Sequence, residues 1–220
     1  MCGRFTLSQP AEAIASIFQL DEVPKLEPRY NIAPTQLVPT LHKSEQHERE
    51  FQMLRWGLIP SWAKESAIGN KLINARAETV AEKPSFRSAF RHRRCLIIAD
   101  GFYEWRRQEG KKQPFYFRLL NGQPFAFAGL WERWQDPNGE RIDSCTIITT
   151  EANEILQPIH DRMPVILKPN DYDLWLDPNQ NSSQLIQLLQ PFPSTAMTSY
   201  PVSTKVNKPT NNTPELINSL

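Results

Sequence analysis

Proline residues are spread along this chain, and they limit what it can fold into. The 220 residues include 19 prolines and only 8 glycines. Proline removes a backbone donor and breaks helix interiors, so the sequence predicts short strands, irregular connections and few long helices. Hydrophobic residues make up 40% of the chain, enough for a well-formed core. We expect one domain over residues 1–220, with an irregular tail from about residue 203.

Short apolar segments alternate with turn signals. Asn121-Gly122 is a strong hairpin signal, residues 136–139 form another turn, and residues 21–34 are predicted as loop. Strands are predicted at 36–42, 50–57, 94–99, 102–106, 114–119, 124–131, 144–150, 165–167 and 195–202, and short helices after Ser8, after Arg76, and at 85–91, 151–156 and 183–190. Because turns join most strands, we predict an α+β domain with a mainly antiparallel sheet and short flanking helices, not a doubly wound fold.

The three cysteines contain no Cys-x-x-Cys pair. Their odd number and spacing argue against a disulfide framework and against zinc, and favour a reducing compartment. Cys95 and Cys145 lie in apolar strands and are expected to be inert core thiols. Cys2 differs, because trimming of Met1 would leave an α-amine and a thiol on one residue. Such an aminothiol can attack an aldehyde with both groups and close a five-membered thiazolidine ring.

Positive charge is concentrated in the middle of the chain, although the net charge is only +1. From Asn70 to Arg118 there are twelve Lys or Arg and five Asp or Glu, so this segment carries +7 and the remainder −6. A basic face of this kind can grip a polyanion. The alternative is a solvated face that distant acids balance in space.

Two titratable residues have surroundings that suit proton transfer. Glu104 is bracketed by aromatic residues, and an apolar pocket would raise its pKa; the alternative is an outward-facing strand glutamate. His160 lies in a loop between two prolines, with Asp161 next to it. It can shuttle protons, or it can be a structural loop histidine.

Three further residues have both a functional and a structural interpretation. The Asn74 amide can orient a nucleophile or hold a hydroxyl, or it can cap a following helix. Arg76 can pair with phosphate. Trp62 lies in a loop, where an aromatic is either anchored in the core or free to stack on a base.

Familiar cofactor and metal signatures are missing from the sequence. There is no glycine-rich dinucleotide motif, P-loop, nucleophile elbow, HExxH or zinc-deaminase motif, so we predict neither a cofactor nor a metal. No apolar run reaches 18 residues, and the N-terminal stretch lacks a signal-peptide core. The expected location is cytoplasmic, in association with the nucleoid when DNA is bound.

Six sequence blocks together resemble the SRAP (SOS response-associated peptidase) family of abasic-site shielding proteins. The blocks are Met-Cys-Gly-Arg-Phe at 1–5, Arg-Tyr-Asn-Ile-Ala-Pro-Thr at 29–35, Trp-Gly-Leu-Ile-Pro at 56–60, Ile-Asn-Ala-Arg-Ala-Glu-Thr at 73–79, Asp-Gly-Phe-Tyr-Glu-Trp at 100–105, and Ile-His-Asp-Arg-Met-Pro at 159–164. They occur in family order and span most of the chain. The resemblance implies a single α+β domain with a barrel-like β core and a groove for single-stranded DNA.

The resemblance also implies roles for individual residues. Cys2, freed of Met1, would form a thiazolidine crosslink with a ring-opened abasic site. Asn74 would position the cysteine and the sugar, and Glu104 and His160 would move protons. The residues that would contact DNA are Arg4, Arg76, Arg162, Trp62 and Trp105. The family is further described with peptidase activity that removes residues ahead of the cysteine, and with lyase-type chemistry.

Two alternatives remain open from the sequence. Some amidohydrolases with an N-terminal nucleophile also begin Met-Cys-Gly, although they do not continue with Arg4-Phe5. A non-catalytic binder of single-stranded DNA is the other. In each case we expect a monomer.

Overall fold

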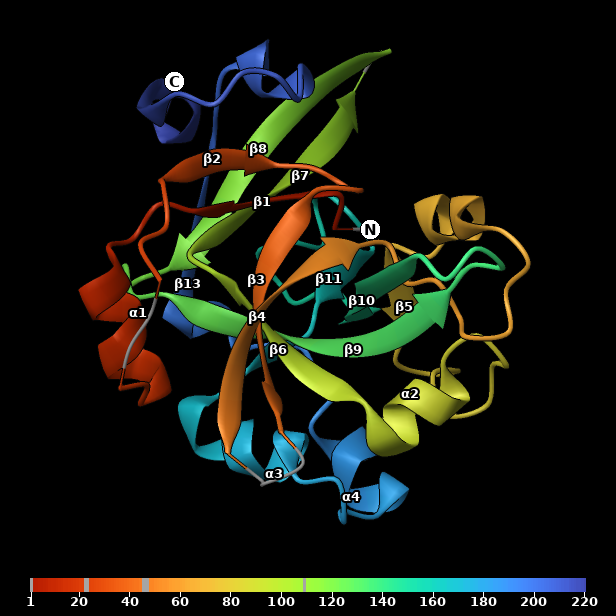
Figure 1. The fold of residues 1–220 in the computed structure, drawn as a ribbon. Coiled ribbons are helices and arrows are strands. Elements are labelled where there is room, and N and C mark those ends of the chain that lie inside the picture. Colours follow the sequence, from red (N-terminus) through yellow and green to blue (C-terminus); the bar gives the residue numbers. More distant parts are fainter. Residues whose placement is uncertain (1, 22–23, 45–47, 109) are drawn as a thin grey trace.

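The strands of this protein form two sheets that share one hydrophobic core (Figure 1). The computed structural model describes residues 2–21, 24–44, 48–108 and 110–220. Most strand pairs are antiparallel and the helices are short, as predicted. Within the described residues, no helix has the length and apolar character needed to cross a membrane.

The first sheet carries the N-terminal strand in its interior. Its strand order is β13 (Met197–Pro201), β8 (Lys111–Leu119), β7 (Gly101–Gln108), β1 (Arg4–Leu7) and β2 (Arg29–Ile32). β1 is paired on both sides, with Arg4 opposite Tyr103 of β7 and Phe5 opposite Ile32 of β2. The prediction of loop throughout 21–34 is therefore wrong, because β1 recruits β2 as a short edge strand in spite of its proline-rich surroundings.

The second sheet closes into a small barrel. β10 (Arg141–Glu151) pairs in parallel with β4 (Arg49–Trp56), and antiparallel pairs lead on through β3 (Leu37–Lys43), β6 (Arg94–Ala99) and β9 (Phe125–Gln135) back to β10. The short strands β5 (Asn74–Arg76) and β11 (Arg162–Pro164) flank β10, and β12 (Ile166–Leu167) flanks β9. This closed ring is the barrel-like core that the family resemblance implies.

The Asn121-Gly122 turn connects the two sheets and does not form a hairpin. Gly122 has a φ of +68° and makes the turn, but β8 before it and β9 after it lie in different sheets. The hairpin prediction is wrong because turn chemistry fixes a local bend and not the partner of each strand. The hairpins are instead β7–β8 and β9–β10.

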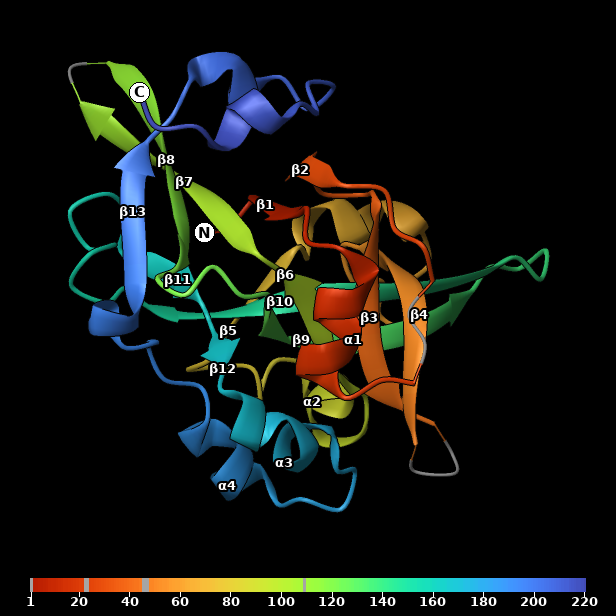
Figure 2. The same cartoon turned by 90° about the vertical axis from the view of Figure 1, so that its left-hand side faces the viewer.

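Short helices lie outside the sheets (Figure 2). They are α1 (Ala11–Phe18), α2 (Arg87–His92), α3 (Tyr172–Leu176) and α4 (Ser182–Gln187). The helix predicted after Arg76 is wrong, because residues 74–76 pair with β10 and turns follow. Residues 151–156 likewise end a strand and enter turns. Ser8 does not cap α1, since its hydroxyl donates to Asp100 Oδ2 at 2.8 Å.

All three cysteines are buried in the core, as the sequence predicts for Cys95 and Cys145. Cys95 and Cys145 are buried and unpaired in disulfides. Burial raises the pKa of both thiols, so they remain protonated.

The C-terminal segment packs against the first sheet. It contains the 3-10 helices η3 (Ser194–Ala196), η4 (Thr204–Asn207) and η5 (Pro214–Ile217). Val206 and Leu216 are buried against Tyr103 and Tyr116, and Val202 forms an isolated bridge with Ser219. The tail is thus a series of short turns held by apolar contacts.

Candidate active site

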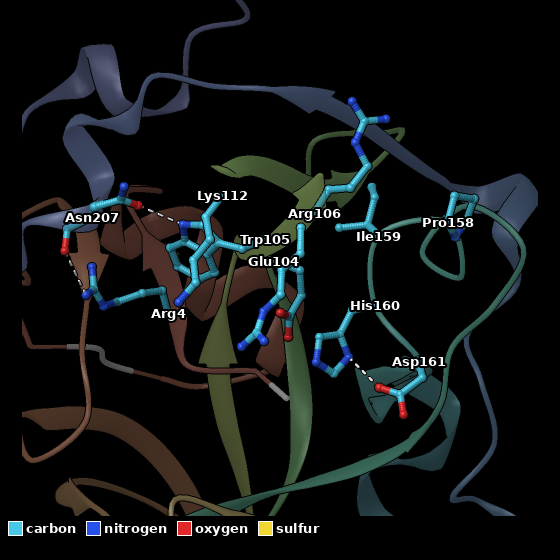
Figure 3. Close-up of a pocket in the computed structure, with 11 residues that line it drawn as sticks. Arg4, Glu104, Trp105, Arg106, Lys112, Pro158, Ile159, His160, Asp161 and Asn207 are labelled. Atoms are coloured by element: carbon cyan, nitrogen blue, oxygen red, sulfur yellow. Dashed lines mark hydrogen bonds and ion pairs between the residues drawn. The ribbon is translucent and has the colours of Figure 1, made fainter. Parts of the chain in front are cut away.

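A pocket of about 760 Å³ opens beside the β7–β8 hairpin (Figure 3). Three parts of the chain form its wall: the β1 and β7–β8 strands, the loop 158–161, and the end of η4. The lining residues are Arg4, Glu104, Trp105, Arg106, Arg107, Lys112, Pro158, Ile159, His160, Asp161 and Asn207. The pocket therefore combines a buried carboxylate and an imidazole with several cationic side chains.

The register of β1 on β7 brings the N-terminus to this pocket. Arg4 lies opposite Tyr103, so the antiparallel chain ahead of Arg4 runs toward Glu104. The Cys2 thiol is fully buried, with Sγ 3.9 Å from the Arg4 carbonyl oxygen. Burial, and after it the charge of Glu104, raises the pKa of Cys2. The thiol is therefore the resting form, and a base must accept its proton before it attacks.

Glu104 has the properties of a general acid and base. It lies on β7 and is only 3% exposed, so the outward-facing alternative is wrong. Burial raises the pKa of Glu104 to about 7, because a low-dielectric environment disfavours the charged form. A group with this pKa can accept and return a proton at neutral pH.

His160 lies in the pocket with Glu104 (Figure 3). The backbone N–H of Arg162 donates to Nδ1 of His160 at 3.0 Å, so the neutral ring carries its proton on Nε2. The same Nδ1 is 3.0 Å from Asp161 Oδ1, a contact that becomes an ion pair only when the ring is protonated. Burial lowers the pKa of His160. The neutral imidazole is therefore the form expected near pH 7.

Asn74 lies on β5, opposite Ile147 of β10. The indole N–H of Trp56 donates to the carbonyl oxygen of Ile73 at 2.9 Å and fixes the start of this strand. The helix-cap alternative for Asn74 is wrong, because the residue is in a strand. Its Oδ1 and Nδ2 atoms are buried, and neither has a hydrogen-bond partner among the described residues. Unpaired buried polar atoms are costly, so this amide is available for a ligand. Asn74 is not among the residues that line the 760 Å³ pocket.

The three predicted phosphate-binding arginines have different surroundings. Arg4 lines the pocket, and its Nη1 donates to Asn31 Oδ1 at 2.6 Å and to the Val206 carbonyl at 2.7 Å. Arg76 is exposed on β5. Arg162 forms a two-pronged ion pair with the carboxylate of Glu78, at 2.6 and 2.9 Å.

The two predicted DNA-contacting tryptophans are also placed differently. Trp62 is 58% exposed, so the core-anchored alternative is wrong and its face is open to a stacking partner. Trp105 lines the pocket, and its indole N–H donates to Asn207 Oδ1 at 2.7 Å.

Sequence reasoning missed several residues of the pocket wall. Arg106, Arg107 and Lys112 belong to the basic segment, whose excess charge was the signal that could have found them. That segment is not one uniform face, since Arg94 is buried and donates to backbone carbonyls, including that of Trp175 at 2.7 Å. Asn207 gave no sequence signal, because its role depends on how the tail packs.

Among the described residues, no cluster of three or more His, Cys, Asp or Glu is placed to hold a metal ion.

The model of the family "SOS response associated peptidase (SRAP)" matches residues 1–209. The chain belongs to the SRAP family. The match covers Cys2, Glu104, His160 and also Asn207, so the pocket wall lies within the region that the family shares.

Curated SRAP relatives are similar along the whole chain. "Abasic site processing protein YoqW" of Bacillus subtilis is 49% identical over 224 residues, which cover 100% of each protein. "Abasic site processing protein HMCES" of Xenopus tropicalis is 37% identical over 225 residues, covering 87% of this chain and 66% of that protein.

Solved structures show the same fold. A crystal structure of a protein from Bacteroides thetaiotaomicron superimposes with a TM-score of 0.88 at 29% identity, over 100% of both chains. Another, of a protein from Bordetella bronchiseptica, gives a TM-score of 0.78 at 29% identity, over 92% of this chain and 100% of that one.

Proposed function

We propose that this SRAP protein processes abasic sites in single-stranded DNA by forming a covalent crosslink through Cys2. The observation that carries the proposal is the placement of Glu104: a buried carboxyl group with a pKa of about 7, beside the N-terminal strand and inside a cationic pocket. An abasic site presents an aldehyde when its sugar ring opens. The names of the relatives as abasic site processing proteins support this choice of substrate.

The proposed reaction begins once Met1 has been removed. The α-amine of Cys2 attacks C1′ of the open sugar, and the carbinolamine loses one water to give a Schiff base. The Cys2 sulfur then adds to C1′, its proton passes to the nitrogen, and a thiazolidine ring closes. One water leaves overall and no redox step is needed.

Glu104 and His160 carry the proton transfers in this proposal. Glu104 accepts the proton of the Cys2 thiol and helps water to leave, which its pKa near neutrality permits. Neutral His160, which carries its proton on Nε2, can donate to the ring oxygen of the sugar as the ring opens. Removal of Met1 places the α-ammonium on Cys2 itself, and this positive charge favours the thiolate.

The unpaired Asn74 amide and the exposed Trp62 extend the proposed substrate path. Buried Oδ1 and Nδ2 atoms can hold the sugar hydroxyl and the amine. Trp62 can stack on a base of the strand. A missing base also lowers the cost of placing the nucleotide in a pocket. The proposed partner is single-stranded DNA, and the proposed oligomeric state is a monomer in the cytoplasm, associated with the nucleoid when bound.

The peptidase and lyase classes follow from the same chemistry. Self-removal of Met1 would be the peptidase step. The Schiff base can also lose the 3′ phosphate by β-elimination, which would be lyase chemistry. Thiazolidine closure removes the imine and so protects the strand from that cleavage.

The decisive experiment combines intact mass with a denaturing gel. Protein whose mass confirms loss of Met1 is incubated with an abasic single-stranded oligonucleotide. We expect a heat-stable crosslink with the wild type, only a borohydride-trappable species with Cys2→Ser, and the wild-type result with Cys95→Ser as a matched control. Absence of a crosslink in Met1-free wild type, or an equally stable one in Cys2→Ala, would overturn the proposal.

A further inference from the structure

The turn end of the β7–β8 hairpin carries an unfavourable pair of like charges. Arg107 of β7 lies directly opposite Lys112 of β8, and the next pair joins Gln108 and Lys111. Arg107, Lys111 and Lys112 are exposed. Like charges directly opposite each other destabilise an antiparallel pair. The arrangement therefore has no stabilising role in the hairpin itself.

Neither member of this pair is neutralised by a described residue. The side chains of Arg107 and Lys112 form no ion pair or hydrogen bond with the residues that the structure describes. By contrast, two of the arginines described above already have partners for their guanidinium groups. Arg4 is occupied by Asn31 and a backbone carbonyl, and Arg162 by Glu78.

Both side chains belong to the wall of the candidate active site. Arg107 and Lys112 line the same pocket as Glu104 and His160. Burial lowers the pKa of His160, and the positive charge of Arg107 contributes further to this shift, so Arg107 lies within electrostatic reach of the imidazole. Figure 3 shows Lys112 on the side of the pocket that also holds Arg4 and Trp105.

Arg106 also lines the pocket, but its side chain lies on the other face of the hairpin from this pair. Its guanidinium lies 5.0 Å from the ring centroid of Phe115, the residue opposite Glu104. The stacked guanidinium is held at the pocket wall while keeping its charge. Arg106, Arg107 and Lys112 thus all line the pocket, with Arg106 directed away from Lys112 (Figure 3).

We propose that Arg107 and Lys112 form a phosphate subsite for the DNA backbone on one side of the reacting nucleotide. This inference rests on the proposed function, because that function places the reacting nucleotide in the pocket. The bound group is a backbone phosphodiester, because an uncommitted pair of cations at a wide polar pocket matches its charge. Trp62 and Arg76 lie on other elements, so the hairpin contacts one flank of the strand only.

The test uses two oligonucleotides of equal length that contain a tetrahydrofuran abasic analogue, which has no aldehyde. One has all its flanking nucleotides 5′ of the analogue, the other all 3′. We expect Arg107→Gln/Lys112→Gln to weaken binding of one of them roughly tenfold and to lower its salt slope by about 0.7, the value for one phosphate of a single strand. Binding of the other should change less than twofold.

A control variant removes the same charge elsewhere. Arg118→Gln/Lys168→Gln changes two cations outside this pocket and should leave both affinities within twofold of the wild type. The hairpin variant should also keep or raise the melting temperature, because it relieves the Arg107–Lys112 repulsion.

Three results would overturn the subsite: equal loss for both oligonucleotides, no loss for either, or equal loss in the control variant. The proposed function is scored separately, by crosslinking of an aldehyde-bearing oligonucleotide at saturation. If the hairpin variant crosslinks at the wild-type rate and binds both oligonucleotides with unchanged affinity, the subsite is wrong and the proposed function stands. If the variant loses affinity for one oligonucleotide but the wild-type protein never crosslinks, the crosslinking mechanism is wrong and the subsite stands.

Discussion

Asn207 accepts a hydrogen bond from the indole of Trp105 at 2.7 Å and so joins the C-terminal segment to the pocket wall. The carbonyl of the same residue is 3.4 Å from Nη2 of Arg4. One tail residue therefore contacts two residues that the family resemblance places at the DNA.

Replacing Asn207 should loosen Trp105 without unfolding the protein. Asn207→Leu removes the acceptor, which is worth about 1 kcal/mol, and we expect roughly fivefold weaker binding of abasic DNA with an unchanged crosslinking rate at saturation. Hydrogen exchange of the Trp105 indole should quicken in Asn207→Leu and stay slow in Asn207→Asp, which keeps an acceptor. Asn218→Ala, at an exposed residue of the same segment, should match the wild type; faster exchange there as well would assign the effect to the whole tail.

Glu104 should make stability fall as pH rises. Burial raises the pKa of Glu104 from 4.5 to about 7, so between these values the folded protein keeps a proton that the unfolded chain has released. The free energy of unfolding therefore decreases through this window, by up to about 3 kcal/mol. Glu104→Gln should remove that slope in urea titrations from pH 4 to 8. An unchanged slope would place the carboxyl group in a more solvated setting.

The same variant should separate chemistry from binding. Glu104→Gln cannot take the thiol proton, so we expect crosslinking at pH 7 to slow by about 100-fold. Affinity for the tetrahydrofuran analogue should remain within about threefold, since the amide has nearly the same shape. Single-turnover kinetics and anisotropy measure the two quantities. A large loss of affinity with normal kinetics would contradict the acid–base role.

Glu78 should restrain Arg162 from binding phosphate. Its carboxylate holds both guanidinium nitrogens, but it is half exposed, so loss of the pair should cost no more than about 1 kcal/mol. We expect Glu78→Gln to strengthen binding of abasic DNA several-fold at low salt. Glu82→Gln changes the net charge equally and should have the smaller effect. If both variants gain the same affinity for DNA, the effect comes from the net charge and not from the release of Arg162.

Trp62 should matter for binding and not for folding. Its side chain is 58% exposed, so Trp62→Ala should shift the melting temperature by less than about 2 °C. Loss of a stacked base should weaken binding by about 1–3 kcal/mol. Leu120→Ala, at a residue equally exposed, serves as the control. Unchanged affinity in Trp62→Ala would remove the stacking role.

The sequence predicted those parts of the fold that depend on local patterns. The strand at 94–99 is an unbroken apolar run between turn signals, and the structure places β6 there. The prediction that β8 and β9 pair with each other was wrong, because no local sequence pattern determines which sheet the next strand will join. The strand at Asn74 was missed for a similar reason, since three residues form a strand only because β10 offers them an edge.

The candidate site was predictable where composition is unusual. The aromatic residues on both sides of Glu104 in the sequence predicted an apolar environment, and burial does raise the pKa of this carboxyl group. The ion pair of Arg162 and Glu78 was not predicted, because it joins residues 84 positions apart in the sequence. Arg107 and Lys112 become a pair only through the register of the β7–β8 hairpin.

The position of β1 between two neighbouring strands has a mechanical consequence. A load applied at Cys2 along the direction of β1 shears the strand past β2 and β7. In shear, the hydrogen bonds along both sides must fail together, whereas an edge strand can be peeled away one bond at a time. The side chain of Arg4, hydrogen-bonded to Asn31 and to the Val206 carbonyl, adds a further anchor two residues from Cys2. A load applied at Cys2 therefore acts on a strand held in the interior of a sheet, and the strand can leave only when the hydrogen bonds to both of its neighbours break.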